Sequence, residues 1–244
     1  MDYSKNQSYF SRDFSIAGFI AGLAVLAVGL ALLTRTGLTL YQNKNVNFSE
    51  VRFFILIPLV FFVTPGALAV IFNVPHRTIS DFEYDASVEG YAFTLRQRAL
   101  DALGIDKSEV KEAVPVILVG YDFEGADRVK QGGDGKWRSS ICKVITMFFS
   151  RDKLYSYTMT FLTTKTGENE ETNVFPYKDI VSVSSELMFQ RAMVRERDII
   201  IIAEAFKLAA RGGTSLLTVN VLDSHYAREA VGTIRALIRR KNQA

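Results

Sequence analysis

Two long, uncharged apolar runs lie near the N-terminus of the chain. The first extends from Phe14 to Leu33, and a helix of about 20 residues rising 1.5 Å per residue matches a hydrocarbon layer of about 30 Å. The second extends from Phe53 to Val74 and contains Pro58 and Pro65. Membrane helices tolerate proline where neighbouring groups satisfy the freed carbonyls. The pattern predicts a transmembrane helical hairpin over residues 14–76 with a kinked second helix.

The segments on either side of this hairpin are more polar. Residues 1–13 are predicted to be an N-terminal tail, and residues 77–112 a connecting helix with a linker. The helix is expected from Asp85 to Leu103, because apolar side chains recur at helical spacing and a glycine follows as a stop signal. These positions are Tyr91, Leu95, Ala99, Leu103 and Gly104.

The pattern changes to β structure from Pro115 onward. About six runs rich in Val, Ile, Thr and aromatic residues are separated by turn sequences such as Gly132–Gly135 and Thr166–Asn169, which is typical of antiparallel hairpins. An amphipathic helix is expected over Ser224–Lys241, with Ala227, Val231, Ile234 and Ile238 on its apolar face. The predicted fold class is α+β: the two-helix hairpin, then a mainly antiparallel β barrel or sandwich over residues 113–244, closed by the C-terminal helix.

One segment of the β region has a family resemblance. The stretch from Phe149 to Ser185 resembles bacterial membrane-anchored proteins with a pleckstrin-homology-like (PH-like) domain, a family of unknown function, in which a strand pair leads into the motif PY-x-D-I-x-x-V. The matching residues are Pro176, Tyr177, Asp179, Ile180 and Val183. The resemblance covers residues 115–241. It implies a PH-like fold, in which peptides dock at an exposed sheet edge or beside the C-terminal helix.

Small residues in the first apolar run predict close helix packing. Gly18, Gly22 and Gly29 lie on this run, and small residues allow helix backbones to approach closely in membranes. The neighbouring helix could belong to the same hairpin or to another chain. Neither run contains an ionisable residue, whereas intramembrane charges are typical of transporters. Transport by these helices alone is therefore not expected.

The charge pattern predicts one candidate ligand site. The formal net charge is +3, which provides no chain-wide basic field for nucleic acid. The loop between the first strands holds Lys130, Lys136 and Arg138, similar to the basic loop with which phosphoinositide-binding PH domains hold phosphates. These residues are the candidate site for an anion or lipid headgroup. The alternative is that they are simply solvated.

No catalytic constellation or cofactor motif is visible in the sequence. The two histidines, His76 and His225, have no companions at metal-ligand spacing, and Cys142 lies in a β run, where it reads as a small buried apolar residue. There is no phosphate-binding glycine-rich motif. A non-enzymatic protein without metal or cofactor is therefore expected.

The orientation of the hairpin is not decided by its flanking charges. The single cysteine, and the absence of a glycosylation pattern beyond Asn47-Phe48-Ser49, favour a cytoplasmic C-terminal domain on a multi-pass protein of a bacterial inner membrane. The expected function is a membrane-tethered binding or scaffold module that binds a protein partner, another copy of itself or an anionic ligand. The alternative is an oligomeric pore-forming or membrane-disrupting effector.

Overall fold

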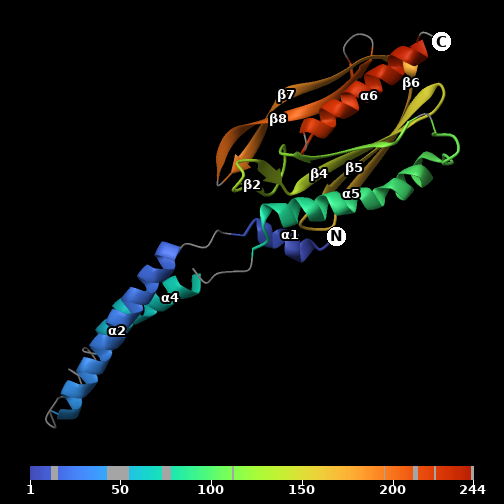
Figure 1. Cartoon of the computed structure of the whole chain (residues 1–244). Coiled ribbons are helices and arrows are strands. Elements are labelled where there is room, and N and C mark those ends of the chain that lie inside the picture. The colour runs from blue at the N-terminus through green and yellow to red at the C-terminus, as the bar shows by residue number, and fades with distance from the viewer. Residues whose placement is uncertain are drawn as a thin grey trace. The chain divides into compact units, whose positions relative to one another are not determined.

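The chain folds into two compact units, shown in Figure 1. One unit comprises Met1–Phe10 and Thr78–Ala244, and the other comprises Ser11–Arg77. The computed structural model describes residues 1–11, 16–42, 55–72, 78–111, 113–194, 196–210, 214–222 and 224–242. The predicted sequon at Asn47 and the histidine at position 76 lie outside the described residues.

The second unit is a pair of apolar helices. Helix α2 covers Ile16–Gln42, and the second helix continues from Ile55 through η1 (Leu59–Val63) into α4 (Thr64–Phe72). Two segments are long and apolar enough to span a membrane, Ile16–Thr39 and Ile55–Phe72. The prediction of two such helices is confirmed, but α2 continues beyond the predicted end at Leu33, through Gly37 to Gln42.

The prolines of the second helix flank a π-helical turn. Pro58 precedes η1, and Pro65 follows Thr64. The N–H of Thr64 donates to the carbonyl of Leu59, five residues earlier, and the Thr64 hydroxyl donates to the same oxygen at 2.8 Å. Because the proline ring collides with the carbonyl four residues earlier in a regular helix, a widened turn relieves that contact.

Glycines bring the two helices of this unit together. A Cβ atom on Gly22 would lie 2.9 Å from the Cβ atom of Ala69, and one on Gly29 would lie 2.8 Å from the Cβ atom of Phe62. Gly66 on α4 approaches the backbone of Leu26 in the same way, at 2.6 Å. Two of the three predicted packing glycines therefore face the second helix of the same hairpin. Gly18 lies on α2 one turn before Gly22.

We expect Gly29→Leu to force the two helices apart, because its side chain would occupy space that Phe62 now fills. Spin labels on cysteines introduced at the exposed positions Leu30 and Leu56 would measure the separation by dipolar EPR. The distance between the labels should increase relative to the parent protein, because the separation of the helix axes, about 8–10 Å in packed helices, would widen. Gly37→Leu is the control, since no atom lies within 4 Å of that position; equal distances in both variants would contradict the close packing.

The first ten residues belong to the other unit, contrary to the predicted tail. Helix α1 (Tyr3–Tyr9) starts at the N-cap Asp2, whose side chain accepts a hydrogen bond from the N–H of Lys5. The buried Asn6 donates to the carbonyl of Thr163 at 3.1 Å, and the ring of Tyr9 stacks on Tyr84 with centroids 4.4 Å apart. Both flanks of the helical hairpin are therefore parts of one folded domain.

The predicted connecting helix is an integral part of the domain. Helix α5 (Asp81–Leu103) begins with a capping box between Ser80 and Glu83 and ends at Gly104 in a left-handed conformation, φ 64°. The predicted stop is confirmed, and the helix begins one turn before the predicted Asp85 because of the capping box. Its buried face comprises Tyr84, Val88, Ala92, Leu95, Ala99 and Leu100.

The described part of the domain contains nine strands in three antiparallel sheets. The four-stranded sheet has the order β1 (Val116–Asp122), β4 (Ile141–Phe149), β5 (Lys153–Leu162), β6 (Glu168–Pro176). A small hairpin is formed by β2 (Val129–Gln131) and β3 (Trp137–Ser139), and the three-stranded sheet has the order β7 (Ile180–Val194), β8 (Arg197–Ala210), β9 (Ser215–Asn220). The number of strands exceeds the predicted six for two reasons. Breaks at Ser140 and at the 3-10 turn η2 (Tyr177–Asp179) divide two of the predicted runs, and strand β2 was not predicted.

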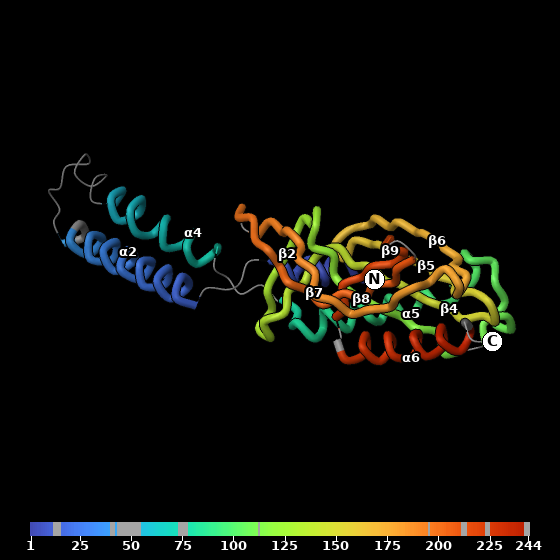
Figure 2. The backbone as a smooth tube through the Cα atoms, turned by 90° about the horizontal axis from the view of Figure 1, so that it is seen from above, coloured from blue at the N-terminus to red at the C-terminus, as the bar shows by residue number. Residues whose placement is uncertain are grey.

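The four-stranded sheet separates two hydrophobic cores. On one face, Val144 and Phe148 of β4 pack in a core with α5 and α1. On the other face, Ile145 and Met147 pack with β7, β8, β9 and helix α6 (Ser224–Asn242). Figure 1 shows α5 along one side of β4 and β5 and α6 on the opposite side, and Figure 2 shows α6 beside β7 and β8. The predicted apolar face of the C-terminal helix is buried, which confirms that element.

Candidate functional site

The basic loop does not form the predicted anion site, because Arg138 is buried and fully bonded. Its side chain is only 2% exposed. The Nε and one terminal nitrogen donate to the carboxylate of Asp85 at 2.8 and 2.6 Å, and both terminal nitrogens donate to Asp134 at 2.9 Å. The carbonyl of Lys136 accepts a further bond at 3.3 Å. All five guanidinium N–H groups are used, so none remains for a phosphate.

The two lysines of the predicted anion site do not converge with Arg138. The ammonium group of Lys130 donates to the carbonyl of Tyr9 at 3.2 Å and lies 4.9 Å from the centre of the Tyr9 ring. Lys136 is exposed at the β2–β3 turn. The prediction of a common site for these three residues is therefore wrong, because Arg138 is bound by Asp134 of its own turn and by Asp85, which lies on a helix 53 residues earlier in the chain.

The acidic partners of Arg138 join three elements. Asp81 at the start of α5 accepts hydrogen bonds from the Tyr9 hydroxyl at 2.7 Å and from the N–H of Gly133 at 2.7 Å. The hydrogen bonds from Arg138 hold the pKa of Asp134 well below its usual range. Burial alone would raise the pKa of Asp81, but the bonds from Tyr9 and Gly133 outweigh it and lower that pKa. The cluster links α1, α5 and the β2–β3 hairpin and therefore has a structural role.

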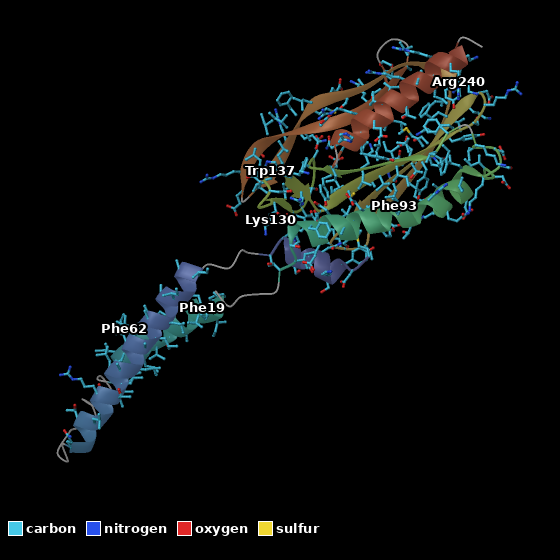
Figure 3. All side chains as sticks on the ribbon, viewed as in Figure 1. Phe19, Phe62, Phe93, Lys130, Trp137 and Arg240 are labelled. Carbon is cyan, nitrogen blue, oxygen red and sulfur yellow. The ribbon has the colours of Figure 1, made fainter. Side chains whose placement is uncertain are left out.

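A groove runs between α5, the edge of β1 and the start of α6. Its apolar end is a pocket of about 320 Å³, lined by Phe93, Ile117, Val119, Val221, Leu222 and Tyr226 among others. A larger polar pocket of about 560 Å³ shares Glu89 and Leu222 with it and extends to Trp137, His225 and Arg228. Phe93 and Tyr226 are large and exposed, and Figure 3 shows Phe93 on α5. We call this feature the α5–α6 groove.

The edge of β1 in this groove carries backbone groups that face away from β4. The N–H of Leu222 donates to the carbonyl of Val119 at 3.0 Å, and the Asn220 side chain donates to the carbonyl of Tyr121 at 2.6 Å. Both bonds come from the side opposite β4, and backbone groups alternate sides along an antiparallel strand. Ile117 therefore also presents its N–H and C=O outward, and no described residue hydrogen-bonds to them there.

The described residues contain no group of three or more His, Cys, Asp or Glu side chains placed to bind a metal. Cys142 is fully buried, and burial raises the pKa of its thiol. His225 lines the polar pocket. A buried neutral thiol is inert as a nucleophile, so the sulfur contributes to packing, as the sequence predicts.

The sequence reasoning missed the residues that build the groove. Phe93 was the one available signal, since it is a large aromatic residue outside the predicted buried stripe of its helix. No sequence pattern indicated Leu222 and Ile117, because their place in the groove depends on where β1 and β9 meet. Comparison with known proteins finds no matching family model, no matching curated protein and no matching solved structure.

Proposed function

We propose that this protein is a membrane-tethered, non-enzymatic binding module whose domain holds an extended segment of a partner protein in the α5–α6 groove. The observation that carries the proposal is the outward-facing backbone of Ile117 beside an apolar pocket lined by Phe93 and Tyr226. The two apolar helices would anchor the domain as a multi-pass protein of a bacterial inner membrane. The domain would face the cytoplasm, as the single cysteine favours.

The strand arrangement supports a PH-like fold for the domain. A four-stranded and a three-stranded antiparallel sheet are followed by one C-terminal helix. The residues of the PY-x-D-I motif connect the two sheets: Tyr177 is buried and its hydroxyl donates to the carbonyl of Ser150 at 3.0 Å. Ile180 and Val183 enter the core beneath α6. These contacts give the motif a structural role in such a fold, because its residues join the two sheets.

The groove suits a peptide that adds to the edge of β1. In strand addition, main-chain hydrogen bonds provide affinity and pockets for alternate side chains provide selectivity. The outward N–H and C=O of Ile117 would supply the main-chain bonds. The pocket beside Phe93 and Tyr226 would accept an apolar side chain, while Glu89 and Arg228 at the polar end would favour charged neighbours.

The test compares Ile117→Pro with Ile117→Ala in the full-length protein in nanodiscs. Peptides selected from a displayed random library on the parent protein serve as probes. Proline removes the outward N–H without breaking a bond to β4, whereas alanine shortens the side chain and keeps the N–H. We expect proline to weaken peptide binding about tenfold or more beyond the effect of alanine.

Two results would contradict the proposed function. One is that the library yields no peptide that prefers the protein over empty nanodiscs. The other is equal affinity of the proline and alanine variants for the selected peptides, with both variants folded by circular dichroism. A Val174→Ala variant on the outer strand β6, whose side chain is also exposed, controls for changes unrelated to the groove.

A further inference from the structure

The outer half of the ribbon formed by β7 and β8 presents an exposed apolar face. β7 pairs with β8 from Ile180 to Val194, but β9 covers only residues 205–209 of β8, so the ribbon extends past the sheet. Alternation along the strands and the pairing of Phe189 with Ile202 place five large apolar side chains on one face. Each is 58–69% exposed: Leu187, Phe189, Met193, Ile200 and Ile202.

The opposite face of the same ribbon is packed against the domain. Ala192 and Ile201 are buried in the core that includes α5. The ribbon is therefore held in place from one side, while the five apolar residues point outward. Soluble domains seldom expose a contiguous apolar patch of this kind unless it contacts a partner or a membrane.

The ribbon lies beside the place where the chain leaves the domain towards the apolar helices. β2 contacts β7, and Lys130 of β2 donates to the carbonyl of Tyr9 at the end of α1. The following turn donates from Gly133 to Asp81 at the start of α5. In Figure 3, Lys130 and Trp137 mark this end of the domain.

Short connections limit how far this end can be from a membrane that holds the helices. Residues 11–15 separate Phe10 from α2, and residues 73–77 separate α4 from Thr78. An extended chain covers at most about 3.6 Å per residue, so each connection reaches roughly 20 Å. Both exits from the domain must therefore stay close to the membrane surface.

The charges on the ribbon suit a lipid interface. Arg191 is exposed on the apolar face between Phe189 and Met193, whereas Arg197, which pairs with Val194 at the start of β8, is exposed on the alternate face. Arginine can lay its aliphatic stem along apolar surface while its guanidinium reaches a phosphate. Asp198, which pairs with Met193, is exposed on the apolar face near the turn and must stay in the water or headgroup layer, and the unpaired strand edges also need water or headgroups as hydrogen-bond partners. Deep burial in hydrocarbon is therefore excluded.

We propose that the outer face of the β7–β8 ribbon rests in the interfacial layer of the bilayer, with Phe189 and Ile202 among the acyl chains and Arg191 at the lipid phosphates. This docking fixes the rotation of the domain on its tether and thereby the direction in which the α5–α6 groove opens. The inference rests on the membrane tether of the proposed function but is independent of peptide binding.

Spin labelling in nanodiscs tests the position of the ribbon. The full-length protein with Phe189→Cys is labelled and reconstituted in phosphatidylethanolamine and phosphatidylglycerol, and collision rates with oxygen and with a water-soluble nickel complex are compared. Cys142 is buried, so the label attaches to the new cysteine. We expect a higher oxygen-to-nickel collision ratio at Phe189 than at the exposed control Val174→Cys on β6.

Two outcomes would overturn the docking. A nickel-accessible label with the same collision ratio as Val174→Cys would place the ribbon in water. A label shielded from both reagents, with dipolar broadening that disappears on dilution with unlabelled protein, would show that a second copy covers the ribbon. Either result leaves the peptide test at Ile117 unaffected, so failure of the docking and failure of the groove are distinguishable.

Discussion

Replacing Arg138 by methionine is expected to lower the free energy of unfolding of the domain by about 1.5–3 kcal/mol, because the charged hydrogen bonds of the buried guanidinium to two partly exposed carboxylates are lost. The substitution leaves the carboxylates of Asp85 and Asp134 facing each other without the cation that now binds both at 2.6–2.9 Å. Denaturant unfolding followed by far-ultraviolet circular dichroism measures the change. Lys136→Met, at an exposed position in the same turn, should stay within about 0.5 kcal/mol of the parent protein.

The same variant should change the response of the domain to acid. The pKa of Asp81 and that of Asp134 are both lowered in the folded state. The stabilisation they provide is therefore complete above the ordinary carboxyl pKa of about 3.9 and is lost as the pH falls through the lower folded values. Arg138→Met should lose much of this dependence below about pH 4. A parent protein and variant with parallel acid profiles would contradict the role of Arg138.

The second large effect is expected at Gly120, where the two larger sheets meet. A Cβ atom at this position would lie 1.4 Å from the carbonyl oxygen of Asn220, and backbone cannot move aside as a flexible side chain can. Gly120→Ala should therefore cost at least the about 1–3 kcal/mol of an overpacked core. The bonds that Leu222 and Asn220 donate to Val119 and Tyr121 should be lost with it.

Hydrogen exchange of the Leu222 amide and chemical denaturation together measure the effect at Gly120. The matched control is Gly90→Ala in α5, where nothing lies within 4 Å of the added methyl group. That change should be neutral or stabilise the domain by up to about 1 kcal/mol, since alanine favours a helix interior over glycine. Equal stability of the two variants would show that β1 and β9 do not approach as closely as described.

The sequence predicted well those elements whose cause is local. Uninterrupted apolar runs indicated both long helices, and Gly104 marked the end of α5 where its left-handed conformation is found. The alternation of β residues located most of the strand positions. The sequence indicated a turn at Tyr177–Asp179, but the run around it was counted as one strand, whereas the turn divides it into β6 and β7.

The sequence predicted the site poorly, because its residues depend on distant partners. Arg138 looks like a phosphate ligand beside Lys130 and Lys136, and only the fold places Asp85 against it. The groove was expected only in general terms, beside the C-terminal helix. The particular residues of the groove depend on how the end of β9 meets β1, and the spacing of apolar residues along the sequence does not show this. Helix α1 was missed because seven residues are too few for a convincing pattern.

The position of α1 has a consequence for biosynthesis. Its residues are made before the hairpin, but Tyr84, on which Tyr9 stacks, is made only after the hairpin, and Thr163, which accepts from Asn6, only after strand β5. The domain is then closed through the N-terminus, around a loop that contains both apolar helices. If both apolar helices cross a membrane, this closure requires the two ends of the hairpin to lie on the same side of it, and a chain with only one helix inserted cannot bury Tyr9 in the domain.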